Sequence, residues 1–177
     1  MEFKLDKTDR LIINAAAKDA DSQVLHCVHI SKGRIEAANG FVLVERKIDY
    51  DGDDLLLDMC DIAKHKDSKA LNAVVYTSDG DNIKAIGQDI NIISKCEGTF
   101  PNTEALYPKA EPVFKISLSK DRLMEVLKCL GKDEEQIKLY FYGQREPVKI
   151  ETISGDVKGM IMPMTANWEE EEESEKK

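Results

Sequence analysis

The sequence lacks the features that would place the chain in a membrane or outside the cell. No apolar run approaches the roughly 18 residues that a membrane-spanning helix needs, and the acidic start Met1-Glu2-Phe3 is unlike a signal peptide. Its cysteines form no Cys-x-x-Cys pair and lie far apart, at Cys27, Cys60, Cys96 and Cys129. Short secreted scaffolds are denser in cysteine, so we expect free thiols, a cytoplasmic location and no membrane partner.

Patterns that indicate a metal site or a catalytic site are also missing. The run His26-Cys27-Val28-His29 offers possible ligands, but strand alternation puts His26 on the face opposite Cys27 and His29. No second ligand pair follows, and the chain has neither a phosphate-binding glycine loop nor a nucleophile elbow. We therefore expect no metal, no cofactor and no catalytic residue, which indicates an accessory protein and not an enzyme.

What the chain does contain is a repeated order of elements. Its 177 residues, 42% hydrophobic and 33% charged, suit a globular protein with a buried core. Alternation and turn residues predict a strand at 3–5, a helix at 9–18 and strands at 24–30, 34–38 and 41–48. Asn39-Gly40 favours a tight turn before the last of these. The same order then recurs at 55–57, 61–69, 73–77, 83–87 and 90–96.

The unit begins a third time after a loop rich in proline and asparagine. Phe3-Lys4-Leu5 before Asp9-Arg10-Leu11-Ile12 is echoed by Phe114-Lys115-Ile116 before Asp121-Arg122-Leu123-Met124. A helix at 121–130, stopped by Gly131, and strands at 137–142, 148–152 and 157–162 complete it. The prediction is an α+β fold of three βαβββ modules, with a two-module domain (1–110), a half domain (111–166) and a disordered acidic tail (167–177).

Charge is distributed unevenly along the chain. The formal net charge of −9 argues against nucleic acid as a partner, but five consecutive glutamates at 169–173 contribute much of it. The predicted helices are net positive, with Arg10, Lys18, Lys64, Lys66, Lys69, Lys120, Arg122, Lys128 and Lys132 against Asp9, Asp61, Asp67, Asp121 and Glu125. Helical lysines commonly form a solvated face, and that alternative stays open.

The stretch Gly159–Met164 combines three methionines with a proline at the end of an apolar strand. Proline removes a backbone donor and stops a strand from continuing inside a sheet. Methionine adapts its shape to irregular apolar partners and is common on surfaces that bind several ligands. The stretch is either a last core strand or one wall of a groove for short hydrophobic peptides.

Taken together, these patterns resemble the bacterial DNA polymerase III beta subunit, the sliding clamp. Gly98-Thr99-Phe100-Pro101 to Leu106-Tyr107-Pro108 is similar to the family's G-x-F-P-…-L-P segment, and Met162-Pro163-Met164 to its terminal M-P-M. Asn39-Gly40-Phe41-Val42-Leu43 is similar to the family's D-G-x-R-L motif, with Asn for Asp and Val for Arg. Residues 1–110 resemble the family's middle domain, and residues 111–166 the second half of its third domain.

The resemblance implies a processivity factor that encircles double-stranded DNA without sequence specificity and tethers DNA polymerase and other proteins through short peptide motifs. One wall of the peptide groove would comprise Val24, Leu25, Ala38, Gly40, Phe41, Val42 and Leu43, with Pro101, Ala105 and Leu106 from the linker. The other would comprise Ser119, Arg122, Pro147, Met160, Met162, Pro163, Met164 and Thr165. The DNA-facing side chains would be Arg10, Lys18, Lys64, Lys66, Lys69 and Lys128.

The number of modules predicts a homo-oligomer. The family's ring has twelve modules, so four chains with three modules each would supply them. The parts of the family's clamps that close the usual two-subunit ring have no counterpart in this sequence. We expect the third helix, with Leu123, Met124, Leu127 and Leu130, to lack cover and to pair with its copy in a dimer. Two such dimers would close a ring. The alternative is a non-ring adaptor or decoy that keeps the groove and competes for peptides, and oligomeric state distinguishes the two.

Overall fold

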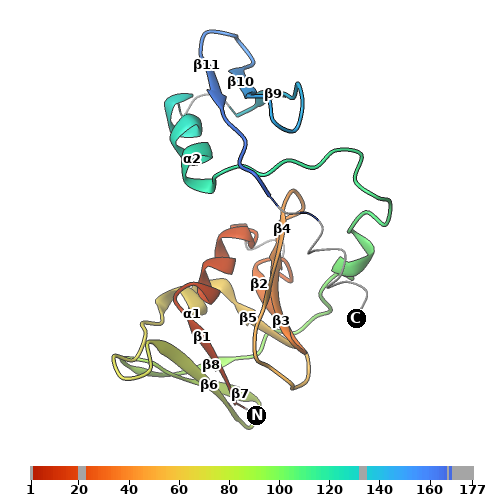
Figure 1. Ribbon diagram of the computed structural model, residues 1–177. Helices are drawn as coiled ribbons and strands as arrows, with labels where there is room; N and C mark the ends of the chain where they lie inside the picture. Colours follow the sequence, from red (N-terminus) through yellow and green to blue (C-terminus); the bar gives the residue numbers. More distant parts are fainter. Residues whose placement is uncertain (1, 20–22, 132–134, 167, 169–177) are drawn as a thin grey trace. The chain divides into compact units, whose positions relative to one another are not determined.

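The computed structural model describes residues 2–19, 23–131, 135–166 and 168. The chain divides into two compact units, Met1–Tyr107 and Pro108–Lys177, which are coloured red to green and green to blue in Figure 1. The acidic tail predicted from the sequence lies outside the described residues, except for Trp168. Within the described ranges, every helix is too short or too polar to cross a membrane.

The first unit is built on two four-stranded antiparallel sheets. One has the order β1-β6-β7-β8 and the other the order β4-β3-β2-β5. The strands are β1 (Glu2–Asp6), β2 (Cys27–Ser31), β3 (Arg34–Ala38), β4 (Leu43–Lys47), β5 (Leu55–Asp58), β6 (Ala73–Asp79), β7 (Asn82–Ile86) and β8 (Ile90–Ser94). Each repeat gives its first strand to the sheet of the other, since β1 pairs with β6 and β5 pairs with β2. This exchange joins the two repeats into one domain.

The first unit also contains a short 3-10 helix, η2 (Thr103–Ala105). The helix of each repeat is shorter than the sequence predicts. The first is a 3-10 helix, η1 (Asp9–Ala15), and it ends because Ala16 adopts an extended backbone with ψ of 152°. The second, α1 (Met59–Lys64), begins two residues earlier than predicted because the Asp58 side chain accepts a hydrogen bond from the Cys60 N–H. Lys18, Lys66 and Lys69 therefore lie outside the helices to which the sequence assigns them.

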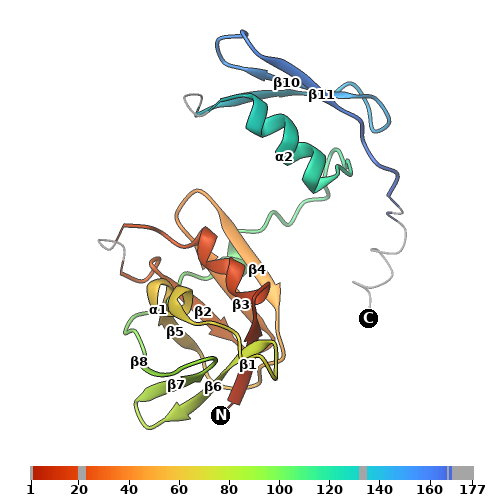
Figure 2. The same cartoon turned by 90° about the vertical axis from the view of Figure 1, so that its left-hand side faces the viewer.

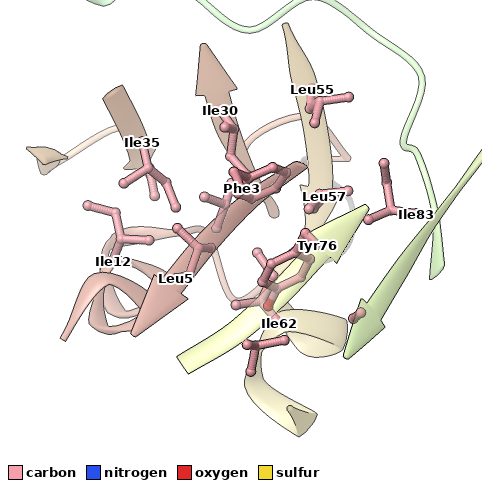
Figure 3. Close-up of a cluster of buried hydrophobic side chains, with 14 of the residues drawn as sticks. Phe3, Leu5, Ile12, Ile30, Ile35, Leu55, Leu57, Ile62, Tyr76 and Ile83 are labelled. Atoms are coloured by element: carbon pink, nitrogen blue, oxygen red, sulfur yellow. The ribbon is translucent and has the colours of Figure 1, made fainter. Parts of the chain in front are cut away.

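The core of the first unit draws on both sheets and on the helices η1 and α1. In Figure 3, Ile12 from η1, Ile62 from α1 and Leu57 from β5 point toward the aromatic side chains of Phe3 and Tyr76. The Phe3 ring stacks on the Tyr76 ring with centroids 5.0 Å apart. Because these side chains come from both repeats, burying them holds the two sheets together.

The second unit has one helix lying across one face of a three-stranded sheet (Figure 2). Its elements are α2 (Lys120–Cys129), β9 (Ile137–Tyr140), β10 (Val148–Thr152) and β11 (Lys158–Ile161), and the antiparallel sheet has the order β11-β10-β9. The strand predicted at 114–116 does not form. Instead, Ser117 makes an isolated bridge with Met164, whose N–H donates to the Ser117 carbonyl at 2.8 Å.

The expectation that the third helix is left uncovered is wrong for most of its apolar residues. Leu130 is buried, and Leu123 and Leu127 pack half-buried against the unit's own core of Val148, Ile150 and Ile161. Only Met124 of the predicted set is exposed, at 46%. A single sheet is therefore enough to cover the leucines of α2.

Candidate peptide-binding surfaces

The turn between β3 and β4 holds an aromatic side chain out into solvent. The Asn39 side-chain oxygen accepts hydrogen bonds from the N–H groups of Phe41 at 3.0 Å and Val42 at 3.1 Å. Gly40 has a φ of 87°, which glycine adopts without strain. The turn predicted at Asn39-Gly40 is thus confirmed, although β4 begins two residues later than expected. Phe41 is 97% exposed at a fixed turn, so its ring is free to contact a partner.

Behind this turn, four predicted groove residues pack in one apolar cluster. Val24, Leu25 and Leu43 are half-buried, and Ala38 is buried. They surround buried side chains that the groove prediction did not include, Cys27, Leu56 and Phe100. Burial, reinforced by a hydrogen bond with the Cys96 thiol, raises the pKa of Cys27 to about 12, so this thiol stays protonated and acts as an apolar group.

The linker segment that carries Pro101, Ala105 and Leu106 is held in place by buried contacts of Thr103 and Phe100. Thr103 is buried and donates from its hydroxyl to the Glu36 carboxylate, whose other oxygen lies 2.7 Å from His29 Nδ1. The Phe100 ring stacks on the His29 ring with centroids 5.0 Å apart. Pro101, Ala105 and Leu106 are exposed beside these anchors. The sequence offered one hint of this network, a glutamate between the apolar residues of β3.

A hollow beside the turn lies between β4 and η1. It has a volume of about 370 Å³ and contains Val42, the one residue of the predicted groove that lines it. The remaining lining comes from η1 and β4, with Thr8, Leu11, Ile12, Asn14, Ala15, Val44, Glu45 and Arg46. Leu11 and Val44 are 56% and 45% exposed, so this apolar surface extends beyond the wall that the sequence predicts.

In the second unit, five of the predicted residues line two hollows. Pro147 and Met160 line a hollow of about 560 Å³ together with Tyr142, Glu146, Lys149, Lys158 and Gly159. Pro163, Met164 and Thr165 line another of about 330 Å³ with Gln144, Arg145, Ala166 and Trp168. Met162 lies on the stretch that joins them and is 53% exposed. Each hollow combines apolar walls with charged neighbours, which suits an apolar side chain flanked by polar groups.

Ser119 and Arg122 lie at the first turn of α2. The Arg122 N–H donates to the Ser119 hydroxyl at 3.4 Å, so Ser119 caps the helix. The Arg122 side chain is exposed.

Comparison with solved structures identifies the fold. No protein-family model matches the sequence, and no curated protein matches it. Superposition on the Bacillus subtilis DNA polymerase sliding clamp gives a TM-score of 0.68 at 13% identity, over 92% of this chain and 49% of the clamp. The chain has the sliding-clamp fold.

Two further clamps agree with this assignment. The DNA polymerase III beta chain of Streptococcus pneumoniae matches with a TM-score of 0.66 at 17% identity, over 93% of this clamp-like chain and 50% of the Streptococcus chain. The Pseudomonas aeruginosa clamp matches with a TM-score of 0.65 at 14% identity, over 94% and 52%. The predicted α+β clamp fold is therefore confirmed, and the chain spans about half the length of these clamps.

The basic residues predicted to face DNA differ in their availability. Arg10 is 9% exposed and donates to the Leu5 carbonyl at 2.9 Å and to Asp67 at 2.6 Å. Its guanidinium is therefore paired with groups inside the clamp-like fold. Lys64 forms a surface ion pair with Asp61 at 2.9 Å. The other predicted cations are exposed: Lys18, Lys66, Lys69 and Lys128. Burial thus removes Arg10 from the predicted DNA-facing set.

Proposed function

We propose that this clamp-like protein is a cytoplasmic processivity factor that tethers DNA polymerase and other replication or repair proteins through short hydrophobic peptides. The observation that carries the proposal is the fixed, exposed Phe41 ring on a sliding-clamp fold, at the position where the sequence resembles the clamp's D-G-x-R-L motif. Its role is accessory, without a catalytic site.

The energetics suit exchangeable partners. The peptide-binding residues that we propose are Phe41 and its neighbours in the first unit and Met160–Thr165 in the second. A leucine and an aromatic anchor of a peptide each gain roughly 1.5–3 kcal/mol on burial. After the cost of ordering the peptide, this corresponds to about micromolar affinity, or roughly −8 kcal/mol. Partners bound this weakly can replace one another on the same clamp.

We also propose an assembly through the edge of β9. In the first unit, the strand after each helix is paired by the first strand of the other repeat, as β5 pairs β2 and β1 pairs β6. β9 follows α2 in the same way, yet among the described residues its only neighbour is β10. The corresponding first-strand segment, residues 113–117, forms no regular strand. Residues 113–117 of a second copy therefore fit the open edge, in a reciprocal exchange about a two-fold axis.

Exposed apolar side chains accompany this open edge. On β9, Ile137 is 37% and Leu139 46% exposed, and Met124 on α2 is 46% exposed. In the segment before α2, Val113 and Phe114 are also exposed. Strand exchange would cover these side chains and satisfy the free backbone groups of β9. Two dimers of this kind supply the twelve modules of a ring around double-stranded DNA.

A second candidate function is a non-ring adaptor or decoy that binds the same peptides. The burial of Arg10 and the pairing of Lys64 favour it, because they leave fewer free cations for phosphates.

Measurement of mass in solution separates the two functions. Light scattering over a wide concentration range, with and without a peptide of the Gln-Leu-x-Leu-Phe type, is combined with calorimetric titration of that peptide. A dimer or tetramer that binds the peptide supports the processivity factor. A protein that stays monomeric at tens of micromolar but binds the peptide supports the adaptor, and a protein that does not bind the peptide overturns both.

A further inference from the structure

We propose that His26, Asp58 and Cys60 form a site for Zn²⁺ or a similar divalent cation in the first unit. One ligand atom from each of these residues lies within 4.8 Å of the other two. The sequence suggests His26 only in combination with Cys27 and His29. The structure gives it two other neighbours, because β5 runs beside β2 and brings Asp58 next to Cys27. This proposal does not depend on the proposed function.

The distances suit a tetrahedral ion. His26 Nε2 lies 3.6 Å from the Cys60 sulfur and 3.8 Å from Asp58 Oδ1. Zinc bonds of about 2.0–2.3 Å to nitrogen, oxygen and sulfur, at tetrahedral angles, separate neighbouring ligand atoms by about 3.3–3.6 Å. Small side-chain adjustments would therefore bring all three atoms to bonding distance of one ion.

The surrounding hydrogen bonds orient the ligands before any ion binds. His26 Nδ1 lies 2.8 Å from the Ala17 carbonyl. Because a carbonyl only accepts, Nδ1 carries the hydrogen and the Nε2 lone pair of the neutral ring faces the cluster. The Met59 N–H donates to the His26 carbonyl at 3.2 Å, and the Cys60 N–H donates to Asp58 Oδ1 at 2.7 Å. These bonds fix the β5–α1 junction against the segment that carries His26.

The donor set suits zinc in particular. Imidazole, carboxylate and thiolate together form a borderline-soft site, and three protein ligands leave a fourth position for water. The His26 side chain is 14% exposed, whereas Cys60 is exposed, so an ion could enter from solvent. A divalent cation would neutralise the negative charges of the Asp58 carboxylate and of a Cys60 thiolate that bind it. The ion would also tie the β5–α1 junction to the segment that contains Val24 and Leu25.

Cobalt and zinc titrations of the full chain test the site. Co²⁺ gives a charge-transfer absorption when a thiolate binds it, and competition between Zn²⁺ and a chelating dye gives the zinc affinity. The variants are Cys60→Ser, His26→Gln and Asp58→Asn. The control is Cys129→Ser, which removes an exposed cysteine of the second unit. Circular dichroism of each metal-free variant checks that it folds.

The expected result is a thiolate band in the unmodified chain and in Cys129→Ser that disappears in Cys60→Ser. Zinc affinity should fall at least about tenfold in each folded ligand variant and stay unchanged in the control. Zinc, but not Mg²⁺, should raise the unfolding temperature of the unmodified chain. Absence of the band from the unmodified chain, or its persistence in Cys60→Ser, overturns the proposal. If Asp58→Asn fails to fold because Asp58 caps α1, the other two variants decide the outcome.

Discussion

The Thr103 hydroxyl donates a hydrogen bond to the Glu36 carboxylate across 67 residues of sequence, and both side chains are at most 1% exposed. His29 contacts the same carboxylate from β2 at 2.7 Å. A buried carboxylate is costly unless its oxygens are paired, so these contacts are needed for Glu36 to be inside the domain. They also fix the start of the linker segment that carries Pro101, Ala105 and Leu106.

Replacement of Thr103 by valine should destabilise the first unit by about 1–3 kcal/mol, because it leaves one Glu36 oxygen buried without its donor. Urea unfolding measures the change. Thr99→Val is the matched control, since Thr99 is exposed on the same segment. Equal stability of the two variants would show that the Thr103 hydrogen bond contributes little.

Replacement of Phe41 by alanine should weaken peptide binding without loss of stability. The ring is 97% exposed in the free protein, so its removal leaves no cavity. Its burial by a peptide contributes roughly 1.5–3 kcal/mol, so affinity should fall about tenfold or more. Calorimetric titration measures this fall, and Ile92→Ala, which is 64% exposed on β8, serves as the control. An unchanged affinity of Phe41→Ala would remove Phe41 from the site.

Val42 stands where the clamp motif has arginine, so this position of the predicted groove carries no positive charge. The unmodified protein should therefore bind neutral and acid-flanked peptides with similar affinity. Val42→Arg should create a preference for the acidic peptide that weakens as salt is added. Val44→Arg adds the same charge outside the predicted wall and should change selectivity less. A strong acidic preference in the unmodified protein would contradict this interpretation of Val42.

Leu139→Lys should weaken the proposed dimer, because it puts a charge on β9 where a second copy would cover an apolar side chain. Loss of one buried leucine contact, roughly 1.5–3 kcal/mol, raises the dimer dissociation constant about tenfold or more. Light scattering or sedimentation measures it, with Ile92→Lys as the control. Leu127→Glu is a poorer test, since Leu127 packs half-buried against the core of the second unit and its replacement would also destabilise that unit. An identical dissociation constant for Leu139→Lys and the unmodified chain would exclude the β9 edge.

Stability should fall as the pH drops below about 6.5 because of His65. Burial lowers the pKa of His65, and the ring lies 3.1 Å from the Tyr76 hydroxyl. The unfolded chain binds a proton near pH 6.5 while the folded chain does not, so protonation favours unfolding. The loss levels off below the folded pKa. Urea unfolding from pH 7.5 to 5 should show a smaller decrease in the free energy of unfolding for His65→Gln than for the unmodified chain. Both proteins keep His26 and His29, so the difference reports on His65. Parallel curves would contradict the role of His65.

The order of elements could be predicted from the sequence because its signals are local. Alternation of apolar residues predicted the strands, and Asn39-Gly40 predicted the turn that presents Phe41. Helix lengths were harder, since the side chain of Asp58 and the extended backbone of Ala16 set the ends of α1 and η1. The first strand of the third module was predicted and is not formed.

Local patterns in the sequence were therefore enough to predict the repeated modules and the apolar surfaces that they carry. Which distant residues meet depends on how the strands pair and how the repeats pack. The pairing of Arg10 with Asp67 depends on how the two repeats pack, and the meeting of His26 with Asp58 and Cys60 depends on the pairing of β2 with β5. Periodicity shows which face of a strand is buried, whereas the choice and register of its neighbours follow from the core that both repeats share.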